Sequence, residues 1–159
     1  MMSCDALTSV GWLAFFLLLL RLSYDDVRVG MLYDRWVMAL ALVGAVLVCL
    51  GRCSTVASSF AGAAVGGGLL FVVRWLSRGG LGGGDVKLAA ALGIWTGLTG
   101  IIVALFVAFV LGSLWGIVQL LCGKGKDAPL PFGPCLAVGG IVGVFFDDAI
   151  ASWYEAWFW

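Results

Sequence analysis

The sequence contains no histidine, and its five cysteines form no Cys-x-x-Cys pair. A structural zinc site needs four cysteine or histidine ligands at characteristic spacings, so the sequence predicts no metal site, and the cysteines are expected to act as small apolar side chains. Charge is scarce as well, because only 11% of the residues are charged and none of them form a basic tract. Nucleic-acid partners require clustered lysine and arginine, so none is expected.

Apolar residues are abundant instead, at 63% of the 159 residues, with a mean hydropathy of +1.12. The apolar fraction of a soluble domain lies nearer to half. We therefore expect an all-α, polytopic membrane protein whose residues 1–159 form a single integral membrane domain, surrounded by membrane lipid.

Six apolar stretches predict about six transmembrane helices, at residues 7–20, 36–50, 56–76, 88–96, 101–122 and 132–146. The continuous stretch 88–121 is too long for one crossing and too short for two full ones, since a crossing takes about 20 residues. We divide it at 97–100. The fourth helix is then expected to begin near Asp85 and to be short or tilted.

Basic residues follow the first, third and fifth stretches: Arg21, Arg28, Arg35, Arg74, Arg78, Lys87, Lys124 and Lys126. Only Arg52 lies in another connection. By the positive-inside rule, these three connections face the cytoplasm and both termini lie outside. The acidic residues of the first and third connections would then share one membrane face. None of the charges falls in the middle of an apolar stretch, which disfavours a transporter.

The segment Gly82-Gly83-Gly84-Asp85-Val86-Lys87 brings a glycine run to the start of an apolar stretch. Glycine lets backbone and substrate approach closely, and Asp85 lies where a helix would begin. One carboxyl group cannot perform aspartic-protease chemistry, because that chemistry needs one acid and one base. The predicted first connection, 21–35, offers the candidates Asp25, Asp26 and Asp34, each of which is also explained as a solvated loop charge.

Three segments resemble motifs of the type IV prepilin peptidases, in the same order along the chain. Residues 82–93 resemble the GxGD-x-K-L-x-x-A-x-G signature, and Asp26-Val27-Arg28 with Leu32 and Tyr33 resembles the first-aspartate motif D-x-R-x-x-x-I-P. Residues 131–134 resemble the PFGP segment that opens the last core helix of this family. The resemblance covers residues 23–143.

The resemblance implies catalytic roles for Asp26 and Asp85. It also implies roles in substrate binding or in shaping the site for Gly82, Gly84, Lys87, Pro131, Phe132, Gly133 and Pro134. Leu32 and Tyr33 depart from the isoleucine and proline of the motif, and Asp25 leaves the assignment open by one position. We prefer Asp26 because the Val-Arg that follows it fits the motif. Lys87 is expected either to accompany Asp85 as a charge partner or to extend to the membrane interface.

The resemblance further implies an aspartic endopeptidase without cofactor, which removes the short basic leader of prepilin-like precursors at the cytoplasmic face of the inner membrane. Asp34 or Asp127 would pair with that leader or remain ordinary loop charges. The first connection lacks the large insert and the CxxC motifs of members that also methylate their product, so methyltransferase activity is not expected. In that shortness the chain resembles the compact peptidases of Flp-type pili or of archaeal preflagellin processing.

Two other functions remain open at this point: a small membrane transporter, and a non-catalytic pilus-assembly factor that binds prepilins. The oligomeric state is open too. Residues 62–66 match a small-xxx-small helix contact, which would form either inside one chain or between two chains.

Overall fold

The computed structural model describes residues 6–158 except 31, 52, 79 and 123–131, and describes side chains as far as residue 146. These residues form five helices: α1 (Ala6–Val29), α2 (Asp34–Cys49), α3 (Val56–Leu76), α4 (Gly83–Leu121) and α5 (Phe132–Phe158). No strand occurs among them, and most of the described residues are helical. The prediction of an all-α protein is confirmed.

Three of the helices, α1, α3 and α4, are long and apolar enough to cross a membrane, judged by length and composition. The segment Phe132–Phe146 of α5 is apolar but shorter. Many large apolar side chains point outward along these helices, including Leu13, Phe60 and Phe106. An outer surface of this kind suits a hydrocarbon environment, in agreement with the predicted membrane protein.

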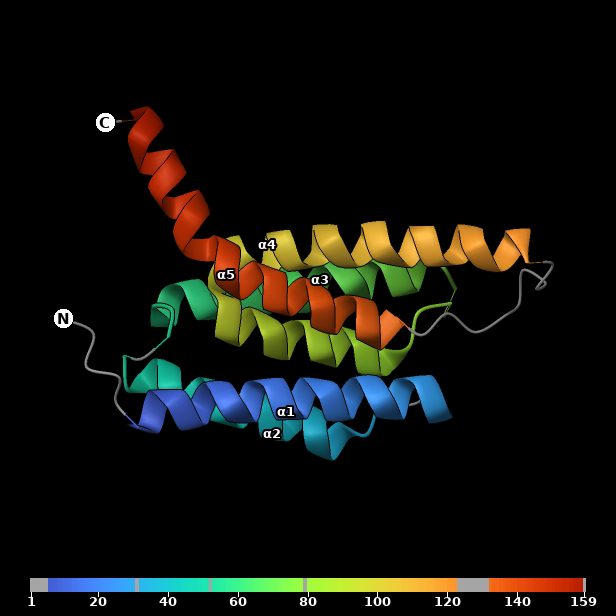
Figure 1. The fold of residues 1–159 in the computed structure, drawn as a ribbon, viewed down its shortest axis with the longest axis horizontal. Coiled ribbons are helices and arrows are strands. Elements are labelled where there is room, and N and C mark those ends of the chain that lie inside the picture. Colours follow the sequence, from blue (N-terminus) through green and yellow to red (C-terminus); the bar gives the residue numbers. More distant parts are fainter. Residues whose placement is uncertain (1–5, 31, 52, 79, 123–131, 159) are drawn as a thin grey trace.

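Helix α4 consists of two helices joined at Gly97, which has φ 66° and ψ −170°. The chain reverses direction there, and the two halves run antiparallel (Figure 1). A positive φ suits glycine, and the backbone N–H of Leu98 donates a hydrogen bond to Ser58 Oγ at 3.0 Å. The predicted division at 97–100 is confirmed. Counted with the two halves of α4 separately, the described helical segments correspond to the six predicted apolar stretches.

The predicted first connection, 21–35, is wrong. Helix α1 continues to Val29, so that Asp25 and Asp26 lie in its last turns and the connection is reduced to 30–33. The apolar pattern stops at Leu20, but Arg21 Nη2 lies 3.4 Å from Asp25 Oδ1 one helical turn later. Such i,i+4 pairs stabilise a helix without any apolar periodicity, which is why hydropathy alone ends the helix too early.

Helix α4 is the centre of the bundle, because it contacts α2, α3 and α5. Its contact with α3 brings backbones together: a Cβ on Gly62 would lie 2.6 Å from the carbonyl oxygen of Gly97, and one on Gly66 would lie 2.7 Å from that of Ala89. The small-xxx-small contact of residues 62–66 therefore forms inside one chain. It holds α3 and both halves of α4 at the close distance that glycine permits.

On the other side of the bundle, Trp95 of α4 joins α1 and α2. Its indole N–H donates a 2.8 Å hydrogen bond to the carbonyl of Leu40, and its ring centroid lies 4.7 Å from that of Phe15. Leu19, Leu40 and Leu88 are buried in the same apolar core. A buried indole is tolerated in such a core only when its N–H has a partner, so this contact fixes α2 against α4.

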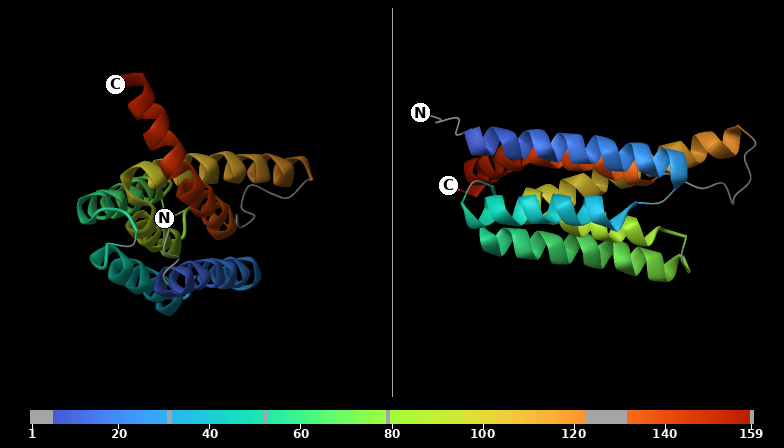
Figure 2. Two further views of the ribbon diagram at one scale, coloured as in Figure 1. Left: turned by 60° about the vertical axis from the view of Figure 1, so that its left-hand side comes forward. Right: turned by 90° about the horizontal axis from the view of Figure 1, so that it is seen from below.

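The helices lie along one long axis, apart from the last turns of α5, which turn away from it, and their connections alternate between the two ends of this axis (Figures 1 and 2). Helices α1, α3 and α4 finish at one end, where α2, α4 and α5 also begin (Figure 1). The start of α1 and the end of α5 lie at the opposite end (Figure 1). The end of α1 that carries Asp26 and the start of α4 that carries Asp85 are thus brought together.

The α3–α4 contact predicts that Gly93→Ala destabilises the protein. A Cβ there would overlap the backbone of Gly62 and Ala63. Overpacking of this kind costs about 1–3 kcal/mol, so the melting temperature in detergent should fall. The matched control is Gly68→Ala, in the same pair of helices, where nothing lies within 4 Å of the added Cβ. Equal melting temperatures for the two variants would contradict the close packing.

The arrangement of the connections predicts that Arg28 and Arg78 lie on the same membrane face. Single cysteines placed at these positions in a cysteine-free background should react with a membrane-impermeant thiol reagent from one side only. The positive-inside rule makes that side the cytoplasm. Labelling of the two positions from opposite sides would contradict the arrangement of α1, α3 and α4.

Candidate active site

A cavity of about 790 Å³ opens at the end of the bundle where α1 finishes and α4 begins. Its lining includes both predicted catalytic residues, Asp26 and Asp85, together with the end of α1, the glycine loop before α4, and two side chains from the end of α4. Asp26 is 7% exposed and Asp85 is 5% exposed. The structure therefore brings two buried carboxyl groups from different helices into one cavity.

Asp26 is held from α5. The backbone N–H of Gly133 donates a hydrogen bond of 2.9 Å to Asp26 Oδ2. A Cβ on Gly133 would lie 2.7 Å from the same oxygen, so the contact is possible only because residue 133 is glycine. The resemblance implied that Gly133 binds substrate or shapes the site. The structure places it directly against Asp26, at the start of α5, where the helix dipole favours a negative charge.

Asp85 lies in the first turn of α4, as predicted, with Gly82 as the N-cap residue. Its side chain turns back to the backbone amide of Gly82, which hydrogen-bonds it. The other oxygen, Oδ1, is buried and has no hydrogen-bond partner among the described residues. Buried polar atoms normally have a partner, so an unpaired oxygen that belongs to a cavity-lining residue is available to water or to a bound molecule.

The glycine run at residues 82–84, which leads into the first turn of α4, fits between two neighbouring elements. A Cβ on Gly84 would lie 2.7 Å from Leu32 Cβ, and one on Gly83 would lie 2.6 Å from Arg74 Nη1. The guanidinium of Arg74 also donates a 3.3 Å hydrogen bond to the carbonyl of Leu81. Glycine is needed at position 84 because the Cβ of Leu32 lies so close, whereas the end of the flexible Arg74 side chain could move away from a Cβ at position 83. The glycine run thus carries Asp85 between α3 and the α1–α2 connection.

Lys87 does not accompany Asp85. Its Nζ lies 2.6 Å from Asp34 Oδ2, and both side chains are more than half exposed. This ion pair joins the first turn of α2 to the first turn of α4. The prediction that Lys87 is a charge partner of Asp85 is wrong, because Lys87 pairs instead with Asp34, which lies 53 positions away in the sequence.

Asp25 is not a solvated loop charge, and that interpretation is also wrong. The residue is 5% exposed, it pairs with Arg21 through Oδ1, and its Oδ2 finds no partner in the described part of the chain. It does not belong to the cavity lining. The adjacent positions 25 and 26 point about 100° apart on a helix, which explains why Asp26 alone reaches the cavity.

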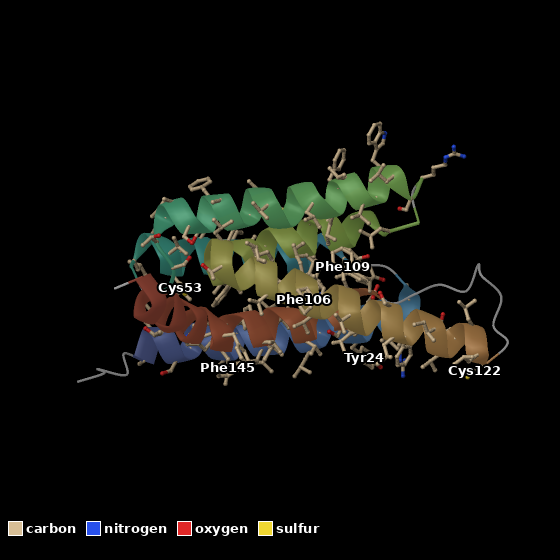
Figure 3. The ribbon with its side chains drawn as sticks, turned by 90° about the horizontal axis from the view of Figure 1, so that it is seen from above. Tyr24, Cys53, Phe106, Phe109, Cys122 and Phe145 are labelled. Atoms are coloured by element: carbon tan, nitrogen blue, oxygen red, sulfur yellow. The ribbon has the colours of Figure 1, made fainter. Side chains whose placement is uncertain are left out.

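Of the remaining predicted residues, Phe132 and Pro134 lie at the start of α5. Phe132 is buried and packs against Phe109 of α4, and the centroids of the two rings are 5.7 Å apart. The position of Phe109 can be seen in Figure 3. Pro134 lies in the first turn of α5, where its missing N–H breaks no helical hydrogen bond. Pro131 and Asp127 lie outside the described residues.

Sequence reasoning missed Arg74, Trp115 and Gln119. Arg74 holds the glycine loop, and Trp115 and Gln119 line the cavity from the end of α4. A signal existed only for Gln119, since it places an amide in a nearly continuous apolar helix. Among the described residues no three His, Cys, Asp or Glu side chains gather in a group that could hold a metal ion.

Comparison with known proteins places the chain in a family. The model of the Type IV leader peptidase family matches residues 13–117, well over half of the chain. The chain is 33% identical over 155 residues to the prepilin leader peptidase/N-methyltransferase of Xanthomonas campestris pv. campestris, a match that covers 91% of this chain and 54% of the relative.

Two further relatives carry the same name. The protein of Stutzerimonas stutzeri is 34% identical over 142 residues, which cover 86% of this chain and 49% of the relative. The protein of Bacillus subtilis is 39% identical over 94 residues, which cover 58% of this chain and 38% of the relative. The chain thus spans about half the length, or less, of these curated relatives. No solved structure gives a significant match. Since the family model matches well over half of the chain, with both Asp26 and Asp85 inside the match, the chain belongs to the Type IV leader peptidase family.

Proposed function

We propose that the chain is a membrane-embedded aspartic endopeptidase that cleaves the leader from type IV prepilin-like precursors. One observation carries most of this proposal: Asp26 and Asp85, from two different helices, are buried and line the same cavity. The names of the relatives supply the class of substrate. The cavity supplies a place where an extended peptide would meet both carboxyl groups.

The chemistry follows from the pairing of two carboxyl groups. Two carboxyls in one site resist being ionised together, so they share one proton. The ionised carboxylate takes a proton from a bound water as the water oxygen attacks the peptide carbonyl carbon. The protonated carboxyl gives its proton to the carbonyl oxygen. When the tetrahedral intermediate collapses, the C–N bond breaks and the leaving nitrogen receives a proton.

The surroundings of each aspartate support distinct tasks. Asp85 Oδ1 is buried and has no hydrogen-bond partner within the described residues, so it is free to accept a hydrogen bond from a water bound between the two carboxyl groups. Asp26 Oδ2 accepts a hydrogen bond from Gly133, which orients its carboxyl group. Asp25 faces Arg21 instead of the cavity, and this favours Asp26 as the catalytic residue at the end of α1.

We further propose that cleavage takes place at the cytoplasmic face of the inner membrane. The cavity lies at the end of the bundle where both α1 and α3 finish, each with arginine near its end, which supports this orientation. We propose peptidase activity alone, of the compact Flp-type kind. Between α1 and α2 only residues 30–33 remain, too few for an inserted domain at this place.

A transporter is less well supported, because Asp26 and Asp85 lie in end turns of their helices and not near the middle of a membrane span. A prepilin-binding assembly factor would have the same fold. If the purified protein cleaves a precursor in detergent, it is a peptidase and not a mere assembly factor. Flux of a solute into liposomes would reveal a transporter.

The proposed mechanism predicts that Asp26→Asn and Asp85→Asn each reduce cleavage by about 10²-fold or more, as is usual when a general acid or base is lost. An amide has the same shape but cannot take up or release the proton. Cleavage of a co-expressed prepilin would be followed by the mobility shift of the product. Asp34→Asn is the matched control and should retain activity, because Asp34 is exposed and outside the cavity. Wild-type activity in Asp85→Asn would exclude the peptidase mechanism.

The contact between Gly133 and Asp26 predicts that Gly133→Ala lowers the cleavage rate. The added methyl group would displace the carboxyl group of Asp26, and misplacement of about 1 Å can cost on the order of 10²-fold in rate. Helix α5 should still form, since alanine favours a helix more than glycine does. Circular dichroism and the cleavage assay would be measured together, with Gly68→Ala as the control. Full activity in Gly133→Ala would show that the position of Asp26 does not depend on α5.

A further inference from the structure

We propose that Trp115 and Gln119 of α4 bind the leader side of the substrate peptide, next to the bond that is cleaved. This inference rests on the proposed peptidase function and adds a binding surface to it. Both side chains line the same cavity as Asp26 and Asp85. They are four positions apart, so they lie on one face of the helix, one turn from each other. Gln119 lies beyond residues 13–117, which the family model matches.

The end of α4 projects beyond the rest of the bundle. In Figure 1 its last turns extend past the start of α5 and the ends of α1 and α3, and Figure 3 marks this projecting end with Cys122. Leu114, Ile117 and Leu121 on these turns are exposed and do not belong to the cavity lining. Trp115 and Gln119 thus lie on the face of the projecting end that lines the cavity. Along this face the cavity lining continues away from the two carboxyl groups.

Gln119 is chemically unusual in its helix. Between Gly97 and Cys122 the polar side chains are only Thr99, Ser113 and Gln119, and Gln119 alone carries an amide. Polar groups in membrane helices are costly and therefore usually functional. No hydrogen bond joins the Gln119 side chain to another described residue. An amide offers donors and an acceptor, which match the C=O and N–H groups that an extended peptide presents.

Trp115 offers a different kind of contact. Its side chain is 53% exposed although it lines the cavity, so a large flat apolar surface is available for a bound molecule. Indole rings bury much area and have few rotatable bonds, which makes them effective anchors for a peptide side chain. Together the two residues form a surface that holds a peptide by its backbone and by one side chain.

The direction of the projecting end assigns this surface to the leader. A peptide whose scissile bond lies between Asp26 and Asp85, and which continues along Trp115 and Gln119, leads away from the apolar middle of the bundle (Figure 1). The resemblance to the prepilin peptidases implies that an apolar helix follows the scissile bond, and such a helix has to remain beside that middle. The segment on the projecting end is therefore the part of the precursor that is removed.

The first test is kinetic and uses a type IV prepilin that the wild-type protein cleaves. Gln119→Ala should raise KM by about 2- to 12-fold, the effect of one lost net hydrogen bond, with kcat unchanged. Trp115→Ala should raise KM by at least as much, and Trp115→Phe should restore most of the affinity. Leu114→Ala, on the same turn but outside the cavity, is the control and should leave KM unchanged. Unchanged KM in both Trp115→Ala and Gln119→Ala would overturn the inference, whereas failure of the wild-type protein to cleave any prepilin would overturn the proposed function.

The second test locates the bound segment. A benzophenone amino acid at position 115, in an Asp26→Asn background that keeps the precursor intact, should crosslink to the leader of the same prepilin. Mass spectrometry of the adduct would identify the attached residue. The same amino acid at position 114 should give no adduct with the leader. A crosslink from position 115 to the segment that follows the scissile bond would overturn the assignment to the leader side.

Discussion

Two buried carboxyl groups line one cavity at the end of an apolar helix bundle, and the structure around them makes their burial tolerable. An unpaired buried charge is costly, so each group needs polar partners that the surrounding side chains do not supply. Backbone N–H groups supply these partners: that of Gly133 at the start of α5 donates a hydrogen bond to Asp26, and that of Gly82 at the start of α4 contacts Asp85. Helix starts carry free N–H groups, which explains why two helices begin at this cavity.

Backbone partners of this kind require close approach, and close approach requires glycine. Gly133 admits the carboxyl of Asp26, and Gly83 and Gly84 admit Arg74 and Leu32 beside the loop that carries Asp85. The same requirement extends away from the cavity. Gly62, packed against Gly93 and Gly97, sets the distance between α3 and both halves of α4. The glycine content of the chain thus positions the site as well as the helices.

Much of this architecture could be predicted from local sequence. Hydropathy located the helical segments, and the break at Gly97 followed from a stretch too long for one crossing. The order of the motifs indicated Asp26 and Asp85. What could not be predicted depends on tertiary contacts: the pairing of Lys87 with Asp34, the burial of Asp25, and the hydrogen bond that spans the 107 positions between Asp26 and Gly133. The extension of α1 to Val29 was missed because polar pairs continue the helix after its apolar pattern ends.

The central claim is that Asp26 and Asp85 act as one catalytic unit, and the most direct test compares residual prepilin cleavage in three purified variants. These are Asp26→Asn, Asp85→Asn and the protein that carries both substitutions. Groups that act as a unit are strongly non-additive, so the double variant should cleave no more slowly than either single variant. A double variant whose loss equals the product of the two single losses would show that the two carboxyl groups act independently, and would contradict this account.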